Sequence, residues 1–415
     1  MYLWEQTIPI MFRQAISQYI NNFRGFRREV WILAIITFIN RAGTMVLPFL
    51  SKYLKENLHF TYDQVGTVMV FFGLGSLIGS WLGGKLSDKI GFYKIMIFSL
   101  FTSGLMFFGI QYVTTFPGLC IAMFSIMVIA DMFRPAMFVS ISTYAKPENH
   151  TKAMTLVRLA VNLGFAAGPA LGGLIIVTIG YRGLFWIDGA TCITSILIFR
   201  LLVKEKKKVS SPETFTDDTK KSRTLKNDKL FWLFLFCSFA TAMVFFQLLT
   251  TLPLYHKEHY GLTEFHTGLL MSFNGLMVFA LEMPLVSFFE RKNVPKLKVV
   301  GWGALLVALS YLVLLFDAWI GILIISIILI TFGEMFNFPF SNSFAFGRAP
   351  KGQEGLYMGW YTMMFSLAHI VSAKLGMGII ATYGYAANWL FMGLFGLFSF
   401  ACCIVLQRLI LKADT

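Results

Sequence analysis

The stretch Gly84-Lys85-Leu86-Ser87-Asp88-Lys89-Ile90-Gly91-Phe92-Tyr93-Lys94 is a short, charged, glycine-containing turn between two long apolar runs. A connection this short makes the two flanking segments antiparallel neighbours. Its lysines favour the cytoplasmic side of a membrane, because loops on that side carry an excess of basic residues. The turn therefore predicts a hairpin of membrane-spanning helices, and the rest of the chain can be placed relative to it.

The overall composition points the same way. Hydrophobic residues make up 57% of the chain and charged residues only 13%, with a mean hydropathy of +0.68. A soluble globular domain carries about 25% charged residues, so the composition predicts a polytopic membrane protein. The net charge of +14 does not indicate nucleic-acid binding, since the basic residues cluster in short loops between apolar runs.

Other classes of function find no support in the sequence. The five cysteines all lie inside apolar runs, which predicts small packing residues and neither a disulfide framework nor a metal site. We find no Walker A loop, no Ser/His/Asp arrangement and no spacing typical of metal ligands. We therefore expect a protein that is not an enzyme and that needs no cofactor.

Twelve apolar runs are long enough to cross a bilayer, which takes about 20 residues as a helix. The predicted fold is an all-α membrane protein with two bundles of six helices. Residues 1–28 form an amphipathic or disordered segment, 29–203 the first bundle, 204–228 a polar cytoplasmic linker and 229–415 the second bundle. The predicted helices are 30–54, 62–86, 94–113, 116–144, 151–180, 182–203, 229–257, 263–289, 296–316, 318–345, 352–382 and 385–411.

The two halves carry traces of an internal repeat. A shift of 202 residues places Gly66 on Gly268 and Gly73 on Gly275, and it also places the acid-base pair 88–89 on 290–291. The second copy lacks counterparts of Gly84 and Gly91, so it is a degenerate version of the first turn. This asymmetry predicts that Asp88→Asn impairs function more than Glu290→Gln.

The turn resembles the signature loop between helices 2 and 3 of major facilitator superfamily transporters, G-x-L-x-D-[RK]-x-G-[RK]-[RK], although Phe92 and Tyr93 replace its basic pair. The resemblance implies two parallel half-repeats with a substrate site near the midplane. It also implies that Gly84, Asp88, Lys89 and Gly91 form a conformational latch, in which Asp88 lies near the start of helix 11 and the helix dipole favours its charge.

The predicted fifth helix carries Asn162-Leu-Gly164-Phe-Ala-Ala-Gly168-Pro169-Ala-Leu-Gly172-Gly173. Glycines four residues apart share one helix face and allow close packing, while Pro169 removes a backbone hydrogen bond. The stretch resembles the G-x-x-x-G-P-x-x-G-G motif of the drug:proton antiporter branch, which adds Gly168 and Pro169 to the conformational latch. A general packing seam of small residues is the alternative.

Ionisable residues within the predicted spans should face a cavity or a partner, because a charge at mid-bilayer costs at least ~2.5–3.5 kcal/mol. Asp131 and Arg134 lie three apart in helix 4 and could neutralise each other. Arg134 resembles the arginine of the family's R-x-x-x-G motif, but the glycine of that motif is absent. The remaining members of this set are Arg41, Glu282, Glu334, His369 and Lys374.

A proton carrier must exchange its proton within the working pH range. Burial favours the protonated carboxyl group, whereas a nearby arginine favours the ionised one. We therefore expect Glu334 to be the proton site, followed by Asp131, His369 and Glu282. Each has an alternative role: Glu334 as a substrate ligand, Asp131 in a structural pair, Glu282 as a hinge contact and His369 in packing. Phe336 and Phe338 are expected to line the cavity around Glu334, which suits an amphipathic substrate.

The leading functional hypothesis is a proton-coupled exporter of amphipathic small molecules that works by alternating access. One alternative is a proton symporter that imports a peptide, sugar or organic anion, with Arg41, Arg134 and Lys374 as a basic substrate site. Another is a lipid or lysolipid flippase, for which a lateral opening lined by apolar residues would be diagnostic. We expect the substrate, protons and the lipid bilayer as partners, a monomer, and residence in a bacterial cytoplasmic membrane with both termini in the cytoplasm.

Overall fold

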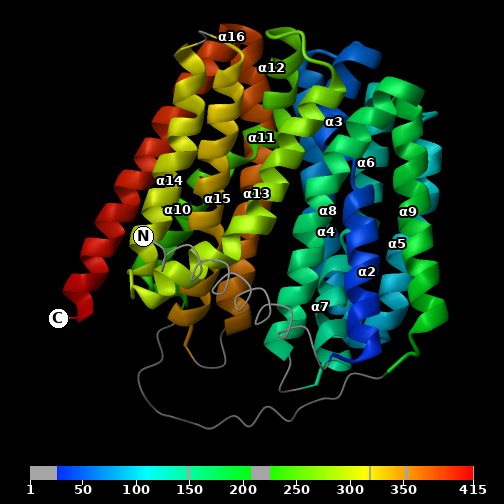
Figure 1. The fold of residues 1–415 in the computed structure, drawn as a ribbon, viewed down its shortest axis with the longest axis horizontal. Helices are drawn as coiled ribbons and strands as arrows, with labels where there is room; N and C mark the ends of the chain where they lie inside the picture. The colour runs from blue at the N-terminus through cyan, green and yellow to red at the C-terminus, as the bar shows by residue number, and fades with distance from the viewer. Residues whose placement is uncertain (1–25, 147–149, 207–224, 317–318, 351–353, 415) are drawn as a thin grey trace, which may run out of the picture.

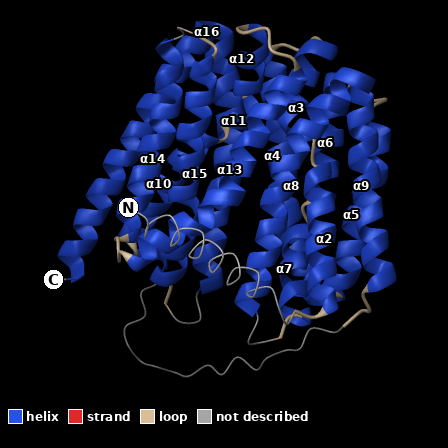
Figure 2. Ribbon diagram, in the orientation of Figure 1, coloured by secondary structure: helices blue, strands red, loops and turns tan. Residues whose placement is uncertain are grey.

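A computed structural model describes residues 26–146, 150–206, 225–316, 319–350 and 354–414. All of the regular structure in these ranges is helical, and the helices form two bundles that stand side by side (Figures 1 and 2). Most of the N-terminal segment 1–28 and of the linker 204–228 lies outside the described residues, as does the side chain of Asp88.

The first bundle holds six membrane crossings. Two of these crossings, the first and the fourth, are each interrupted. The helices are α2 (Arg28–Gly43), α3 (Val46–Lys52) and η1 (Tyr53–Asn57) for the first crossing, then α4 (Tyr62–Ile90), α5 (Phe92–Ile110), α6 (Phe116–Ala130) with α7 (Phe133–Tyr144), α8 (His150–Ile179) and α9 (Tyr181–Leu202).

The second bundle repeats this plan with its own interruptions. A short 3₁₀ turn, η3 (Leu225–Asn227), precedes the first of its crossings. The helices are α10 (Lys229–Phe245), α11 (Gln247–Thr250) and α12 (Leu252–Glu258) in one crossing, then α13 (Glu264–Arg291), α14 (Lys296–Leu312) with η4 (Val313–Phe316), α15 (Gly321–Arg348) and α16 (Glu354–Asp414).

Within the described residues, eleven helical segments are long and apolar enough to cross a membrane. The last of them, Tyr357–Lys412, is interrupted at Gly384, whose φ of 82° is a conformation that glycine adopts easily. The chain turns back there, so this segment supplies two crossings. The all-helical fold of two bundles is thus confirmed, and the break at Gly384 falls between the two predicted helices 352–382 and 385–411.

The structure corrects three predicted helices that were drawn as continuous. The run 30–54 breaks between α2 and α3, the run 116–144 breaks at Asp131 and Met132, and the run 229–257 is divided into α10, α11 and α12. The first break is stabilised from another helix: the carboxylate of Asp188 accepts hydrogen bonds from the backbone N–H groups of Met45 and Val46, each at 3.1 Å. A helix start supplies such unpaired N–H groups.

The two bundles meet along two pairs of helices, α4 with α16 and α8 with α13. The glycines that the repeat aligned lie in these seams: Gly66 and Gly73 of α4 pack against α16, while Gly268 and Gly275 of α13 pack against α8. The helices that flank the linker in the sequence, α9 and α10, respectively end and begin at the same end of the molecule, and the C-terminal part of α16 finishes toward that end as well (Figure 1). We call this end the linker end and the other one the opposite end.

Candidate functional site

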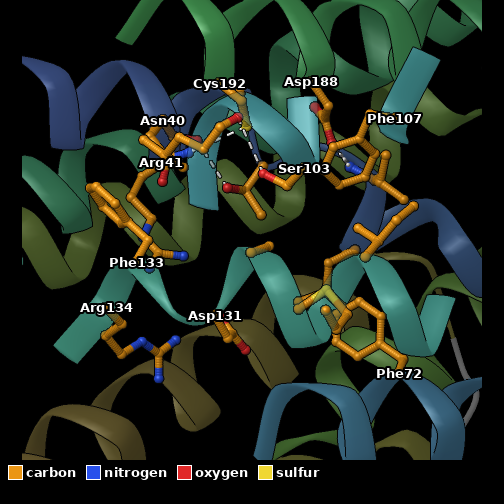
Figure 3. Close-up of a pocket in the computed structure, with 18 of the residues that line it drawn as sticks. Asn40, Arg41, Phe72, Ser103, Phe107, Asp131, Phe133, Arg134, Asp188 and Cys192 are labelled. Atoms are coloured by element: carbon orange, nitrogen blue, oxygen red, sulfur yellow. Dashed lines mark hydrogen bonds between the residues drawn. The ribbon is translucent and has the colours of Figure 1, made fainter. Parts of the chain in front are cut away.

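The first pocket lies inside the first bundle and carries most of its buried charge (Figure 3). It has a volume of about 80 Å³ and is lined by Asn40, Arg41, Asp131, Arg134 and Asp188, among others. Arg41 lies in the last turn of α2, and its guanidinium stands 5.7 Å from the ring centre of Phe165. Its buried Nε makes no hydrogen bond within the described residues. The pocket therefore presents an incompletely satisfied cation.

Asp131 and Arg134 lie together at one wall of this pocket, apart from Asp188 and Cys192 (Figure 3). Asp131 is the residue at which α6 ends, and its carboxylate accepts a hydrogen bond from the hydroxyl of Ser76 on α4. Arg134 belongs to the next helix, α7, and its side chain is exposed. Among the described residues the two form no ion pair, because the interruption between α6 and α7 removes the single-helix spacing on which the predicted pairing depended.

The second pocket lies at mid-depth between the two bundles. Its volume is about 220 Å³, and both halves line it: Leu47, Pro48, Asn162, Phe165 and Pro169 from the first, and Phe245, Phe246, Leu248, Leu249, Met271, Asn274, Gly275, Val278 and Glu334 from the second. Glu334 is the one ionisable side chain in this lining. The amide of Asn274 donates to Glu334 at 3.3 Å and to Thr331 at 2.8 Å. The site thus combines an apolar wall with a single carboxyl group.

His369 stands between the two pockets. Its ring packs 5.6 Å from Phe72, which lines the first pocket, and 4.8 Å from Phe246, which lines the second. Its Nε2 is buried without a hydrogen-bond partner in the described part of the chain. The position fits either of the roles expected for it, a proton site or a packing residue.

Several residues expected at the site lie elsewhere. Phe336 packs against Phe289 at 5.1 Å, and Phe338 packs against Phe245 at 4.9 Å; neither lines the pocket of Glu334. The aromatic rings that do line it are Phe165 of α8, Phe245 of α10 and Phe246, which follows α10. The sequence of a phenylalanine-rich helix does not show which rings face a cavity, because phenylalanine is equally common on lipid-facing surfaces and in packed cores.

Lys374 and Glu282 instead join the two bundles. The ammonium of Lys374 donates to Asp63 at 2.6 Å and to Thr67 at 2.8 Å, so Lys374 does not join Arg41 and Arg134 in the first pocket. Glu282 forms an ion pair with Arg158 of α8. Glu282 therefore contacts the other bundle, and its alternative role as a hinge contact stays a prediction.

A cluster of contacts holds the bundles together at the opposite end. Lys52 pairs with Glu264 at 3.5 Å, and the Glu258 carboxylate accepts hydrogen bonds from Tyr62 and, at 2.8 Å, from Tyr385. Sequence reasoning missed Lys52, Arg158, Asp188 and Asn274. A charged or amide side chain inside a predicted span was the available signal, and it applies to all four.

The residues of the fifth-helix motif lie where α8 meets its neighbours. A Cβ added to Gly168 would stand 3.1 Å from the carbonyl oxygen of Ala42, so α8 packs closely against α2 at this glycine. Next to Pro169, the backbone N–H of Ala170 donates to Ser272 of α13 at 2.9 Å. Gly84 and Gly91 have open space around them, and Lys89 is exposed at the linker end.

Two helical bundles that enclose largely apolar pockets with a few charged residues, and that are joined by ion pairs at each seam, define a polytopic membrane protein of the transporter class. The Major Facilitator Superfamily model matches residues 33–373, which is most of the chain. The protein belongs to the Major Facilitator Superfamily of transporters.

Known proteins resemble it over nearly its full length. The MFS-type transporter YttB of Bacillus subtilis is 23% identical, with 93% of this chain and 97% of YttB covered, and a Na⁺, Li⁺, K⁺/H⁺ antiporter of Planococcus maritimus is 22% identical over 87% of this chain and 91% of the antiporter. Among solved structures, a POT family transporter in complex with 5-aminolevulinic acid superimposes with a TM-score of 0.79 at 16% identity, covering 95% of this chain and 98% of that one. This likeness concerns the fold.

Proposed function

We propose that the protein is a proton-coupled secondary transporter that exports amphipathic small molecules by alternating access. One observation carries the proposal: Glu334 is the single ionisable side chain in an otherwise largely apolar pocket that both bundles line. Such a pocket accepts an amphipathic molecule, and its carboxyl group responds both to protons and to an occupant.

The surroundings of Glu334 suit a residue that exchanges a proton. Asn274 donates to the carboxylate, which stabilises the ionised form, whereas the apolar walls favour the neutral form. Arg158 of the other bundle is engaged by Glu282, so it does not neutralise Glu334 permanently through an ion pair. Exchange of substrate for proton requires the two to compete at this site: a substrate that enters the pocket releases the proton of Glu334, and its departure allows the carboxyl group to take up a proton again.

The contacts along the two seams are expected to open and close as the bundles move. The contacts of Lys52 with Glu264, Asp63 with Lys374 and Tyr62 with Glu258 hold the bundles together at the opposite end. A rocking motion of one bundle against the other would open that end and close the linker end, which is the alternating-access scheme for this architecture. We assign the linker and both termini to the cytoplasmic side of a bacterial cytoplasmic membrane, with the monomer as the working unit.

Two relatives support export. The Planococcus maritimus protein is named as a cation/H⁺ antiporter, and the quinolone resistance protein NorA of Staphylococcus aureus is 26% identical over 182 residues, which are 44% of this chain and 46% of NorA. Both names describe those proteins, and we extend to this chain the coupling to protons and the efflux of an amphipathic molecule.

One observation favours a second candidate, a proton symporter that imports an organic anion. Arg41 and Arg134 line the same pocket, and neither forms an ion pair with another described residue. Two cations in one pocket suit a carboxylate or a phosphate. The direction of substrate movement in intact cells separates the two candidates.

The test uses the purified protein in proteoliposomes that contain a pH-sensitive dye. Amphipathic cations and anions are added in turn, and we expect at least one of them to drive proton movement. Glu334→Gln should abolish this coupling, while the matched control Glu205→Gln, on the exposed surface, should retain it. Full proton-driven transport by Glu334→Gln would remove Glu334 from this role, and no proton movement with any compound would contradict the proposal.

A further inference from the structure

The two seams between the bundles differ in how far they extend. The α8–α13 seam is closed over most of its length. Near the opposite end, a Cβ on Gly173 would stand 2.5 Å from the carbonyl oxygen of Glu264, and at mid-depth a Cβ on Gly275 would stand 2.7 Å from Cα of Ala166. Toward the linker end, Arg158 and Glu282 form their ion pair. Little space is left along this side of the molecule.

The α4–α16 seam is closed only in its upper half, near the opposite end. There a Cβ on Gly66 would stand 3.3 Å from Cα of Lys374, and Lys374 itself reaches Asp63. Toward the linker end the helices enclose a cavity of about 630 Å³, lined by α4, α7 and α16. A Cβ added to Gly359 in this lining would meet no atom within 4 Å.

The cavity lies at membrane depth and has apolar, exposed walls. All of its lining residues belong to segments long enough to span the membrane. Trp81 is 62% exposed, while Phe138 and Met363 are each 45% exposed. At this depth exposed apolar side chains face lipid and not water, so the hollow is open to the acyl chain of a molecule dissolved in the surrounding leaflet.

A single charged residue stands in this apolar wall. Arg134 is the one ionisable residue lining the cavity, and it forms no ion pair with any other described residue. It also lines the first pocket, where Arg41 lies. An unpaired cation at this depth is unfavourable, so an anionic head group would stabilise it. Asp131, beside it, does not line the cavity and accepts its hydrogen bond from Ser76.

We propose that the gap between α4 and α16 is a lateral portal, and that it admits a membrane-dissolved amphiphile with one acyl chain and an anionic head group from the leaflet at the linker end. Arg134 binds the head group, and Ile78, Trp81, Phe138 and Met363 contact the chain. The inference deepens the proposed function, on which it rests, because it names the class of substrate and its route to the central pockets.

The experiment follows the fluorescence of Trp81 in the full-length protein reconstituted in bilayers. Bromine atoms quench tryptophan on contact, so 9,10-dibromostearate serves as the anionic probe and an alkyl trimethylammonium with the same dibrominated chain as the cationic one. The portal signal is the quenching that Trp81→Phe removes. Trp186→Phe is the matched control, since Trp186 is 50% exposed on α9, away from the portal.

We expect the anionic probe to produce saturable quenching of Trp81 and the cationic probe to produce only the linear quenching of bilayer partition. Arg134→Gln should weaken the apparent affinity about tenfold or more, the loss expected for a charge-assisted contact, and Arg134→Lys should restore most of it. If Arg134→Gln does not fold, Gly359→Phe provides a second variant, because it fills open space in the lining and should abolish saturable quenching.

Three results would overturn the portal: linear quenching by both probes, equal saturation by the cationic probe, or saturation that keeps its original affinity in Arg134→Gln or persists in Gly359→Phe. The measurement requires neither a proton gradient nor turnover. Its failure would therefore leave proton-coupled export through Glu334 standing, and loss of that coupling would leave binding at the portal measurable.

Discussion

The ammonium of Lys52 lies 3.5 Å from the carboxylate of Glu264, and this ion pair joins the two bundles at the end opposite the linker. The side chain of Lys52 is completely buried, and that of Glu264 is 11% exposed. The ammonium makes no hydrogen bond within the described residues, so the attraction between the two groups is chiefly Coulombic. Both charges have lost most of their water, and each depends on the other.

Lys52→Met should weaken the closed state of this end. Removing one partner of a buried ion pair costs about 3–5 kcal/mol, because the other charge stays buried alone. We expect Lys52→Met and Glu264→Gln each to lower the thermal unfolding temperature. Each should also increase the chemical labelling of side chains at the opposite end, because that end opens more often. The double variant should recover much of the loss. Lys292→Met, at an exposed position, is the control. Additive losses in the double variant would show that the two residues are not coupled.

The ion pair of Arg158 and Glu282 should act on the other end of the molecule. Arg158 is 44% exposed, so solvent reduces the strength of the pair to about 1 kcal/mol. The pair is formed in the observed state, which is open at the linker end, so Glu282→Gln should lower the population of that state by roughly fivefold. Spin labels at the exposed positions Lys146 and Lys292 report this as a shorter distance. The exchange Arg158→Glu with Glu282→Arg should restore the original distribution, and failure to do so would argue against a direct pair.

Asp188 should be required for the interruption of the first crossing. Asp188→Ala leaves the N–H of Val46 without its acceptor, at a cost of about 1–3 kcal/mol for that buried donor, and leaves the N–H of Met45 only the carbonyl oxygen of Gly43 at 2.8 Å. Asp188→Asn keeps one acceptor and should cost less. Thermal unfolding gives the loss, and faster hydrogen exchange in the segment around Met45 locates it. Thr178→Val, whose hydroxyl bonds only within its own helix, should change neither. Unchanged exchange in Asp188→Ala would refute this role.

Sequence reasoning was strongest where a property belongs to one segment. Hydropathy and the polar linker predicted the two bundles, and the predicted boundary between 352–382 and 385–411 falls at Gly384, whose backbone conformation is local. The glycines at 66, 73, 268 and 275 were found from the repeat alone, and the structure places all four in the seams. Close packing of backbones leaves a signal in the sequence, since it selects the residue that lacks a side chain.

The sequence was weakest where a property depends on a partner. The break after Gly43 could not be seen from residues 30–54, because the acceptor that stabilises it lies 143 positions from Met45. The carboxyl groups of Asp131, Glu264 and Glu282 were each visible as charges within or beside a span. Their partners Ser76, Lys52 and Arg158 come from other helices, and for Glu264 and Glu282 from the other bundle. These partners can be identified only when the packing of the two halves is known.

The α8–α13 seam offers a test that separates a packing requirement from a helix preference. Alanine stabilises an exposed helix by up to about 1 kcal/mol relative to glycine. A Cβ on Gly275 would stand 2.7 Å from Cα of Ala166, whereas a Cβ on Gly378 would meet nothing within 4 Å. Gly275→Ala should therefore force the bundles apart, reduce transport and lower the unfolding temperature, while Gly378→Ala should maintain or raise that temperature. Equal effects of the two substitutions would mean that the seam accommodates a methyl group by shifting, and that its glycines are not required for close approach.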